Sequence, residues 1–297
     1  ISPTEGTNMK GVYRNADGDP IVVPIVMYHD EKNNRFFNSS GAYIKGRGLA
    51  VKEPTNETSV RAEFSGKPVN GAFSYGLVNS NPANSSRGFN LIGNPYPSNL
   101  DLIKFYQDNA AGGNFSPTFY FWDNNANTRT TQEGDGYGGQ AYATFNAATP
   151  TGVGTATQAT GDSGTSVLKL PTRYVKVAQG FMAKLENTAT QNIIFSNSMR
   201  KAVAAEGFFG KNDYLEEEVD RYWLKLISSS HLASNIAVVY FEEGDDGFTR
   251  EDSRSMGGSD AVFSIVNGQK VSINGKSSFV NTDQVPLGTT HYANGIY

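Results

Sequence analysis

The chain has 297 residues and a formal net charge of -4, and its basic residues are scattered, which argues against a nucleic-acid-binding protein. It contains no cysteine, so disulfides, thiolate nucleophiles and cysteine-ligated metal centres are excluded. No apolar run approaches the ~20 residues that cross a bilayer as a helix, so we expect no membrane insertion.

Turn-forming and aromatic residues set the local pattern. The 32 glycines and 12 prolines favour turns, and the 15 tyrosines and 18 phenylalanines suit half-buried strands. Short runs of alternating apolar and polar residues lie between the turns and predict strands. In chain order these strands are Ile21–His29, Ala42–Lys52, Ser59–Phe64, Gly71–Val78, Phe89–Gly93, Thr118–Trp122, Gln140–Phe145, Tyr174–Leu185, Asn192–Ser196, Arg221–Ile227, Ile236–Phe241, Ala261–Val266, Gln269–Ile273 and Thr290–Tyr297.

The best candidate for a helix is the stretch Asn99–Asn109. Ser98 is its predicted N-cap, and Asp101 falls in the first turn, where a negative charge is favourable. Leu102 and the apolar residues after it form one side of the helix. We interpret this helix as a short excursion between strands.

Two changes in composition suggest how the chain is organised. Residues 147–164 are mostly Ala, Thr, Gly and Ser, which predicts a mobile loop because such a segment buries little apolar surface. Residues 206–218 are rich in charge and predict a linker. We therefore expect an all-β protein with two antiparallel, jelly-roll-like β-sandwich domains in tandem, 1–205 and 219–297.

The most specific motif is GFNLIGNPYPSNLD at Gly88–Asp101. Its glycine, asparagine and two prolines predict a tight, rigid turn between a strand and the helix. An architectural role explains the motif. The alternative is a ligand role for Asn94, Tyr96 and Asn99, since a rigid loop with an aromatic residue can stack on a small sugar or peptide.

Three polar clusters raise the question of calcium. Asn15, Asp17 and Asp19 alternate as in a calcium loop, and so do Asp123, Asn125 and Asn127, but neither cluster has a glutamate at the expected position. The third cluster is EEGDDGFTRED at Glu242–Asp252. Solvated turns explain all three, so no cofactor is predicted and calcium is the alternative left open.

Catalytic motifs are absent from the sequence. It has no G-x-S-x-G, no Walker loop and no H-E-x-x-H. The three histidines, His29, His231 and His291, are far apart along the chain. These features predict a protein that is not an enzyme. Carboxylate pairs for glycoside hydrolysis come from separate strands, so a carbohydrate-active or carbohydrate-binding protein is the alternative. Its exposed aromatic ligand contacts would be Tyr96, Trp122 and Tyr137.

Several segments, in order, resemble the secreted surface proteins of Bacteroidetes that the type IX system exports. The similarity is to the β-sandwich region before the C-terminal sorting domain. NLIGNPYPS within Gly88–Asp101 and VAQGFMAK at Val177–Lys184 are the specific segments. The others are IKGRGLAV at Ile44–Val51, FSGKPVNG at Phe64–Gly71, FYFWD at Phe119–Asp123, FSNSMRKA at Phe195–Ala202, RYWLKL at Arg221–Leu226, YFEEGDDGFTRED at Tyr240–Asp252, VSING at Val271–Gly275 and VPLG at Val285–Gly288.

The resemblance implies β-sandwich modules, an extracellular or outer cell-surface location, and a noncatalytic role in adhesion, gliding or surface display. Partners would be other surface or secretion-system proteins, with glycans as an alternative. The sequence departs from the resemblance at Thr249, where another acidic residue is expected, and in having no sorting domain after Tyr297. We therefore expect a processed product or part of a longer chain.

The last predicted strand, Thr290–Tyr297, contains no charged residue. An unprotected strand edge offers unpaired N–H and C=O groups to another chain. The sequence therefore predicts self-assembly or a partner at this strand. The alternative is a strand whose edge is covered, or one that a turn at Asn294–Gly295 breaks.

Overall fold

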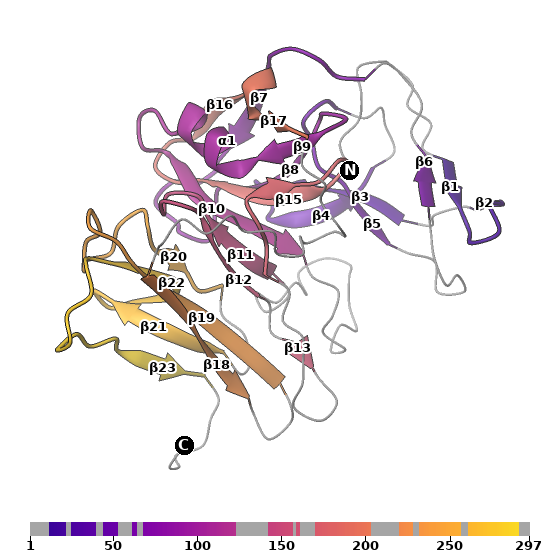
Figure 1. The fold of residues 1–297 in the computed structure, drawn as a ribbon. Helices are drawn as coiled ribbons and strands as arrows, with labels where there is room; N and C mark the ends of the chain where they lie inside the picture. The colour runs from indigo at the N-terminus through magenta and orange to yellow at the C-terminus, as the bar shows by residue number, and fades with distance from the viewer. Residues whose placement is uncertain are drawn as a thin grey trace. The chain divides into compact units, whose positions relative to one another are not determined.

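The computed structural model describes residues 12–21, 25–39, 44–52, 61–63, 68–122, 142–156, 159–160, 170–202, 220–227, 232–256 and 261–290. These residues form strands in several sheets and one α-helix (Figure 1). The predicted all-β fold is confirmed, and the antiparallel sheets are consistent with sandwich-like layers. Among the described residues, no helix is long and apolar enough to span a membrane.

The chain divides into two compact units that interleave along the sequence. Unit 1 contains Ile1–Phe115, Glu133–Asp135 and Tyr174–Ala204; unit 2 contains Ser116–Gln132, Gly136–Arg173 and Ala205–Tyr297. The predicted domains, 1–205 and 219–297, are instead consecutive. The difference arises because the middle of the chain pairs and packs with C-terminal strands. The predicted linker, 206–218, lies outside the described residues.

Unit 1 is built from small antiparallel sheets. Their orders are β2-β1-β6, β4-β3-β5 and β14-β9-β17, together with the pairs β16-β7 and β15-β8. The strands are β1 (Val12–Arg14), β2 (Pro20–Ile21), β3 (Ile25–Asp30), β4 (Arg35–Asn38), β5 (Ala50–Lys52), β6 (Arg61–Glu63), β7 (Phe73–Val78), β8 (Phe89–Gly93), β9 (Asn99–Asp101), β14 (Tyr174–Val175), β15 (Gly180–Leu185), β16 (Thr190–Phe195) and β17 (Arg200–Lys201). A 3-10 turn, η3 (Asn197–Met199), precedes β17.

The helix of unit 1, α1, spans Leu102–Asn109 and begins later than predicted. The residues before it form β9, which pairs with β14 and β17. Asp101 is the N-cap, because its carboxylate accepts hydrogen bonds from the N–H groups of Ile103 and Lys104. The predicted cap, Ser98, instead accepts a hydrogen bond from Arg200.

Phenylalanine rings form the core around α1. Phe105, which is fully buried, lies 5.0 Å from the Phe195 ring of β16, measured between ring centroids. It meets Phe115 and Phe181 edge-on at 5.7 and 6.0 Å. Edge-to-face contacts of this kind add to the free energy of burial, so the helix is anchored through one ring.

Unit 2 contains two groups of strands. The first is the meander β10 (Phe115–Trp122, with Phe115 in unit 1), β11 (Tyr142–Asn146) and β12 (Val153–Thr155). The second has the order β13-β19-β22-β21-β23, with β18 beside β19 and β20 beside β22. Its strands are β13 (Ala159–Thr160), β18 (Asp220–Ile227), β19 (Leu232–Tyr240), β20 (Ser253–Arg254), β21 (Val262–Val266), β22 (Gln269–Lys276) and β23 (Leu287–Thr289).

The sheet of unit 2 is mixed, which corrects the prediction of purely antiparallel sheets. Strands β19 and β22 pair in parallel, with Ala237 opposite Ile273. A parallel pair needs a long crossover, and the chain between Tyr240 and Gln269, which includes β20 and β21, provides it.

The predicted mobile loop, 147–164, contains strands β12 and β13, so the prediction is wrong for residues 147–156. Val153 is buried in a cluster with Ala237, Val239 and Ile273. Gly154 has no side chain, and a Cβ there would lie 2.3 Å from the carbonyl oxygen of Pro171. Small residues therefore allow close packing here, and they do not signal disorder.

Candidate functional site

The conspicuous turn at 94–98 is held together from within. The buried Asn94 amide donates to the carbonyl oxygens of Ser98 and Lys176 at 2.8 and 2.9 Å, and its oxygen accepts the Tyr96 N–H at 3.1 Å. The Tyr96 hydroxyl donates to the Gly71 carbonyl at 2.9 Å. The architectural interpretation of this motif is therefore supported by its contacts.

Tyr96 does not provide the exposed aromatic surface that a ligand contact requires. The residue is only 1% exposed, and burial raises the pKa of its hydroxyl to about 12, although the Arg200 guanidinium acts in the opposite direction. Asn99 is buried in β9. These two positions, proposed from sequence as ligand contacts, serve the packing of unit 1.

The other predicted aromatic contacts lie elsewhere or outside the described residues. Trp122, at the end of β10 in unit 2, is half-buried and meets the Tyr142 ring edge-on at 5.2 Å. Tyr137, His231 and His291 lie outside the described residues. His29 packs edge-on against Phe36, and burial lowers its pKa.

The described calcium-like clusters bind the chain's own groups. The Asn15 side chain accepts the N–H groups of Asp17 and Asp19, which closes the turn between β1 and β2. In the Glu242–Asp252 segment, the buried Asp252 carboxylate accepts N–H groups from Thr249 and Gly275 at 2.8 and 3.2 Å. The cluster at 123–127 lies outside the described residues. Among the described residues, no three metal-ligating side chains come together.

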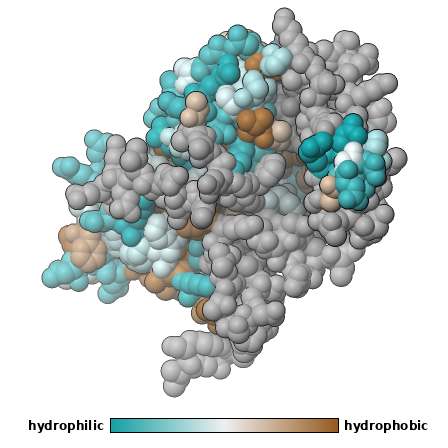
Figure 2. Space-filling view, turned by 45° about the vertical axis from the view of Figure 1, so that its right-hand side comes forward, coloured by the Kyte–Doolittle hydropathy of each residue, from teal (hydrophilic) through white to brown (hydrophobic). Residues whose placement is uncertain are grey.

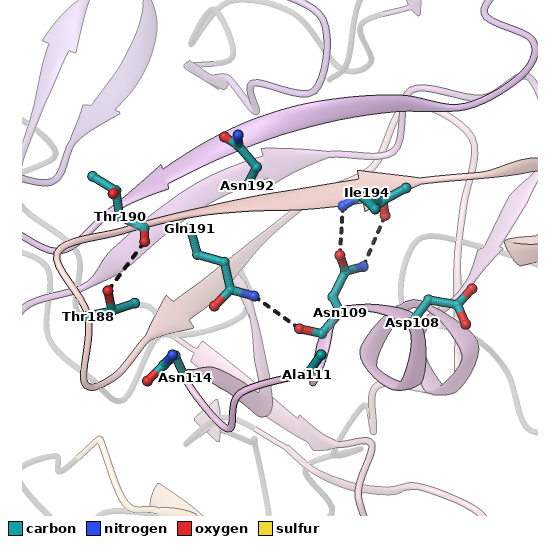
Figure 3. Close-up of a pocket in the computed structure, with 9 residues that line it drawn as sticks. All are labelled: Asp108, Asn109, Ala111, Asn114, Thr188, Thr190, Gln191, Asn192 and Ile194. Atoms are coloured by element: carbon teal, nitrogen blue, oxygen red, sulfur yellow. Dashed lines mark hydrogen bonds between the residues drawn. The ribbon is translucent and has the colours of Figure 1, made fainter.

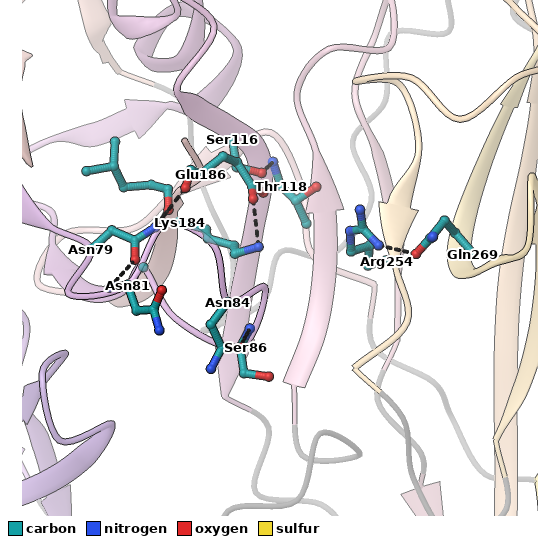
Figure 4. Close-up of polar contacts among 12 residues, drawn as sticks. Asn79, Asn81, Asn84, Ser86, Ser116, Thr118, Lys184, Glu186, Arg254 and Gln269 are labelled. Atoms are coloured by element: carbon teal, nitrogen blue, oxygen red, sulfur yellow. Dashed lines mark hydrogen bonds and ion pairs between the residues drawn. The ribbon is translucent and has the colours of Figure 1, made fainter. Parts of the chain in front are cut away.

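Buried asparagines also fix loops to strands. The Asn79 amide donates to the carbonyl oxygens of both Leu185 and Glu186 at 2.8 Å (Figure 4). Beside them the Lys184 ammonium and the Glu186 carboxylate form an ion pair of 2.8 Å. In unit 2, Asn146 donates to the carbonyl oxygen of Arg250. Carboxamides thus join main-chain segments that are far apart in sequence.

A hollow of about 380 Å³ lies in unit 1, between the C-terminal end of α1 and strand β16 (Figure 3). Its lining is mainly amide and hydroxyl groups, with one carboxylate and one large apolar side chain. The lining residues are Asp108, Asn109, Ala111, Asn114, Thr188, Thr190, Gln191, Asn192 and Ile194.

Asn109 fixes the wall of this hollow. Its amide nitrogen donates to the carbonyl oxygens of Phe105, at 2.8 Å, and of Ile194, at 3.0 Å, and its side-chain oxygen accepts the Ile194 N–H at 2.6 Å. Gln191 donates back to the Asn109 carbonyl at 3.0 Å. Figure 3 shows the contacts of Asn109 with Ile194 and with Gln191, which join α1 to β16. The site is therefore preorganised.

The sequence matches one known protein family over almost its whole length. Residues 2–297 match the family described as "Domain of unknown function (DUF8693)". The chain belongs to this family. No curated protein and no solved structure matches it. The hollow of this DUF8693 chain was not predictable from the sequence. Asn109 and Ile194, which meet at its wall, are separated by 85 residues and belong to no recognisable motif.

One face of the molecule is largely polar where its residues are described. Figure 2 shows a face on which the described residues are mostly hydrophilic, with hydrophobic residues in small separate patches. Isolated exposed apolar residues are ordinary in proteins. The hollow between α1 and β16 is the concave feature of the described residues that we consider as a site for a small ligand.

Proposed function

We propose that this chain is a noncatalytic structural or adhesive module of an extracellular surface protein, of the class that the type IX system exports. The observation that carries the proposal is the use of the buried asparagines. Asn79, Asn94, Asn109 and Asn146 all bond the chain's own main chain through their amides. The buried polar groups are thus engaged in holding strands and loops in place.

Carboxamides suit such a role for a chemical reason. They donate and accept hydrogen bonds but do not titrate, so the links they form do not depend on the pH or redox state outside a cell. In a chain without cysteine, they connect distant segments without covalent links. The resemblance in sequence supports the location and the partners, which we propose are other surface or secretion-system proteins.

The test is an adhesion measurement. Beads that carry the purified chain are placed on surfaces of the producing cells and on glycan-coated surfaces, and the force needed for detachment is measured. We expect specific retention that heat-unfolded chain lacks. Hydrolysis of a polysaccharide by the purified chain, or retention no greater than that of the unfolded chain, would contradict the proposal.

A second candidate is carbohydrate binding without catalysis. The hollow between α1 and β16 favours it, because amide and hydroxyl groups on a rigid frame match the hydroxyl groups of a sugar. The predicted aromatic contacts do not carry this candidate, since Tyr96 is buried. A glycan array probed with the chain tests it directly.

A further inference from the structure

The main chain of β16 points alternately toward β7 and away from it. The Asn79 N–H donates to the Ala189 carbonyl, so this pair belongs to the hydrogen-bonded pairs of the antiparallel ribbon. By alternation, every second residue after Ala189 also faces β7. The N–H and C=O groups of Asn192 and of Ile194 therefore face outward.

Primary carboxamides fill outward positions on both edges of this ribbon. On β16, the Asn109 side-chain oxygen accepts the Ile194 N–H at 2.6 Å, and its nitrogen donates to the Ile194 C=O at 3.0 Å. On β7, the Asn90 side chain binds the N–H and C=O of Val78 in the same way, at 3.1 and 2.9 Å. One ribbon thus uses the same group twice for the same pair of main-chain atoms.

The shape of the carboxamide explains this use. A primary carboxamide has two N–H bonds, one of which lies on the same side as its oxygen, so a donor and an acceptor point in one direction. A secondary amide holds its N–H and C=O on opposite sides, because the trans form is preferred. At neutral pH a carboxylate only accepts hydrogen bonds, and an ammonium or guanidinium group only donates them. The side chains that match both outward groups of one strand residue are therefore those of asparagine and glutamine.

The next outward position on β16 is free. Within the described part of the chain, the N–H and C=O of Asn192 have no hydrogen-bond partner. Asn192 lines the hollow beside Ile194, and on its other side the Thr188 hydroxyl donates to the Thr190 carbonyl at 3.4 Å (Figure 3). Asn192 thus offers the same pair of groups that Asn109 binds at the neighbouring outward position.

An added strand does not fit at this position. A strand that paired with Asn192 would continue past Ile194, where the Asn109 side chain already lies. Two residues of a strand span only about 6.6 Å, at a rise of about 3.3 Å per residue. The site therefore accepts one short group rather than an extended main chain.

The surroundings favour an uncharged polar group. The Asp108 carboxylate of the lining is paired with Lys104 at 2.5 Å, so its charge is balanced locally. Asn114 and Gln191 add amides to the lining, and the Ile194 side chain, 48% exposed, adds an apolar surface. A hollow of about 380 Å³ with this lining has room for a carboxamide side chain and part of the loop that carries it.

We propose that the hollow is a docking pocket for an asparagine or glutamine side chain of a partner protein, whose primary carboxamide binds the N–H and C=O of Asn192. This inference rests on the proposed adhesive function, for which it names the group that is recognised. A partner's side chain is favoured over a free small amide, because two hydrogen bonds at an exposed edge give only roughly millimolar affinity and are useful within a larger contact. Asn192 and Ile194 are both exposed, so the surface of a partner can reach them.

The first experiment compares two probes that differ by one methyl group. N-acetylglutamine methylamide carries a primary carboxamide, and methylation of its side-chain nitrogen puts the methyl group in place of the N–H beside the oxygen. Each probe is titrated into the full chain, and the Asn192 amide signal is followed by nuclear magnetic resonance. We expect the parent probe to bind in roughly the millimolar range and to shift this signal, and the methylated probe to bind at least about tenfold more weakly.

A matching pair made from N-acetylasparagine methylamide is titrated alongside, because the length of the preferred side chain is decided by this comparison. Discrimination within either pair supports the inference. Equal binding within both pairs, or no shift at Asn192, overturns it. N-acetylalanine methylamide offers only main-chain amides, so binding as tight as that of the glutamine and asparagine probes would show a site for main chain and would also overturn the inference.

Two variants of Asn192 separate its main chain from its side chain. Asn192→Pro removes the outward N–H and leaves the ladder to β7 intact, since proline is tolerated where a strand's N–H faces away from its neighbour. Asn192→Ala keeps the N–H and removes the side chain. We expect the proline variant to bind the parent probe about tenfold more weakly than the alanine variant. Equal affinities contradict the inference, and thermal unfolding checks that both variants fold.

Bead adhesion separates this inference from the function on which it rests. If beads with the proline variant adhere to the producing cells as strongly as beads with the alanine variant, the adhesive function stands and the inference fails. If no beads adhere but the probes still discriminate at Asn192, the carboxamide site stands and the adhesive function is wrong. Adhesion that the alanine variant keeps and the proline variant loses supports both.

Discussion

Asn109 joins the last turn of α1 to the edge of β16 with three hydrogen bonds from one buried side chain. Asn109→Asp keeps the acceptor for the Ile194 N–H but replaces the donor to two carbonyl oxygens with a charged oxygen. We expect a loss of about 2–3 kcal/mol in the free energy of unfolding at pH 7, measured in urea. Asn81→Asp, at an exposed position, is the control and should cost less than about 0.5 kcal/mol.

Asp252 makes the stability of unit 2 depend on pH. The pKa of its carboxyl is raised to about 6, chiefly because the group is buried. The hydrogen bonds from the N–H groups of Thr249 and Gly275 lower this pKa, and the negative charges of Glu251 and Asp245 raise it. Because the folded pKa lies above the unfolded value of 3.8, its contribution is fully present below about pH 4 and is lost as pH rises through about 6.

The expected loss between pH 4 and pH 7 is about 2 kcal/mol in order of magnitude. Nuclear magnetic resonance of the Asp252 carboxyl carbon measures the pKa directly, and urea unfolding across this range measures the stability. Asp252→Asn should remove this part of the pH dependence. A carboxyl that titrates near 4 in the folded chain would contradict the prediction.

The chemistry of single residues also explains which features of the candidate site were predictable from the sequence and which were not. The turn character of Asn94 and its prolines followed from local rules, because a turn depends on neighbouring residues. Whether Tyr96 faces solvent depends on Gly71 and Phe195, which are distant in sequence, so its burial was not predictable. The hollow likewise depends on Asn109 meeting β16, a contact that no local pattern encodes.

At the scale of elements, the turn between β11 and β12 depends on one glycine. Gly152 has φ +75°, and a Cβ there would lie 2.2 Å from the buried Phe145 ring. Gly152→Ala should therefore cost about 3 kcal/mol in unfolding free energy, from a strained backbone and the clash. Gly113 has φ +70°, and an added Cβ there would have no atom within 4 Å, so Gly113→Ala should cost only about 1 kcal/mol. If the two variants lose equal amounts of unfolding free energy in urea, backbone strain alone accounts for the loss and the clash with Phe145 adds nothing.

Strands were predictable from the sequence and their partners were not. The prediction Phe89–Gly93 coincides with β8, because alternation is a local property. The start of α1 was placed too early because β9 is defined by its pairing with β14 and β17. Strand β12 was missed altogether, since its small residues form a strand only when β11 and the core of unit 2 are present.

At the scale of the whole molecule, unit 2 cannot be cut from the chain at a single point. Val153 completes the cluster of Ala237, Val239 and Ile273. The Trp223 indole donates to the Gly154 carbonyl at 3.0 Å. Asn235 accepts the Ala156 N–H at 3.1 Å. Residues near 155 thus cover the C-terminal strands, although the sequence predicts an independent domain at 219–297.

We therefore expect the fragment 219–297 not to fold alone. Without β12, the apolar faces of Ala237 and Val239 lose their cover, and removing buried contacts of this size costs several kcal/mol, comparable to the stability of a small domain. Its amide spectrum should be poorly dispersed and its thermal unfolding non-cooperative. Co-expression with residues 1–205, which supply β12, should restore both properties and co-purify the two fragments. Cooperative unfolding of 219–297 by itself would instead establish the consecutive division, with β12 as an accessory to a complete core.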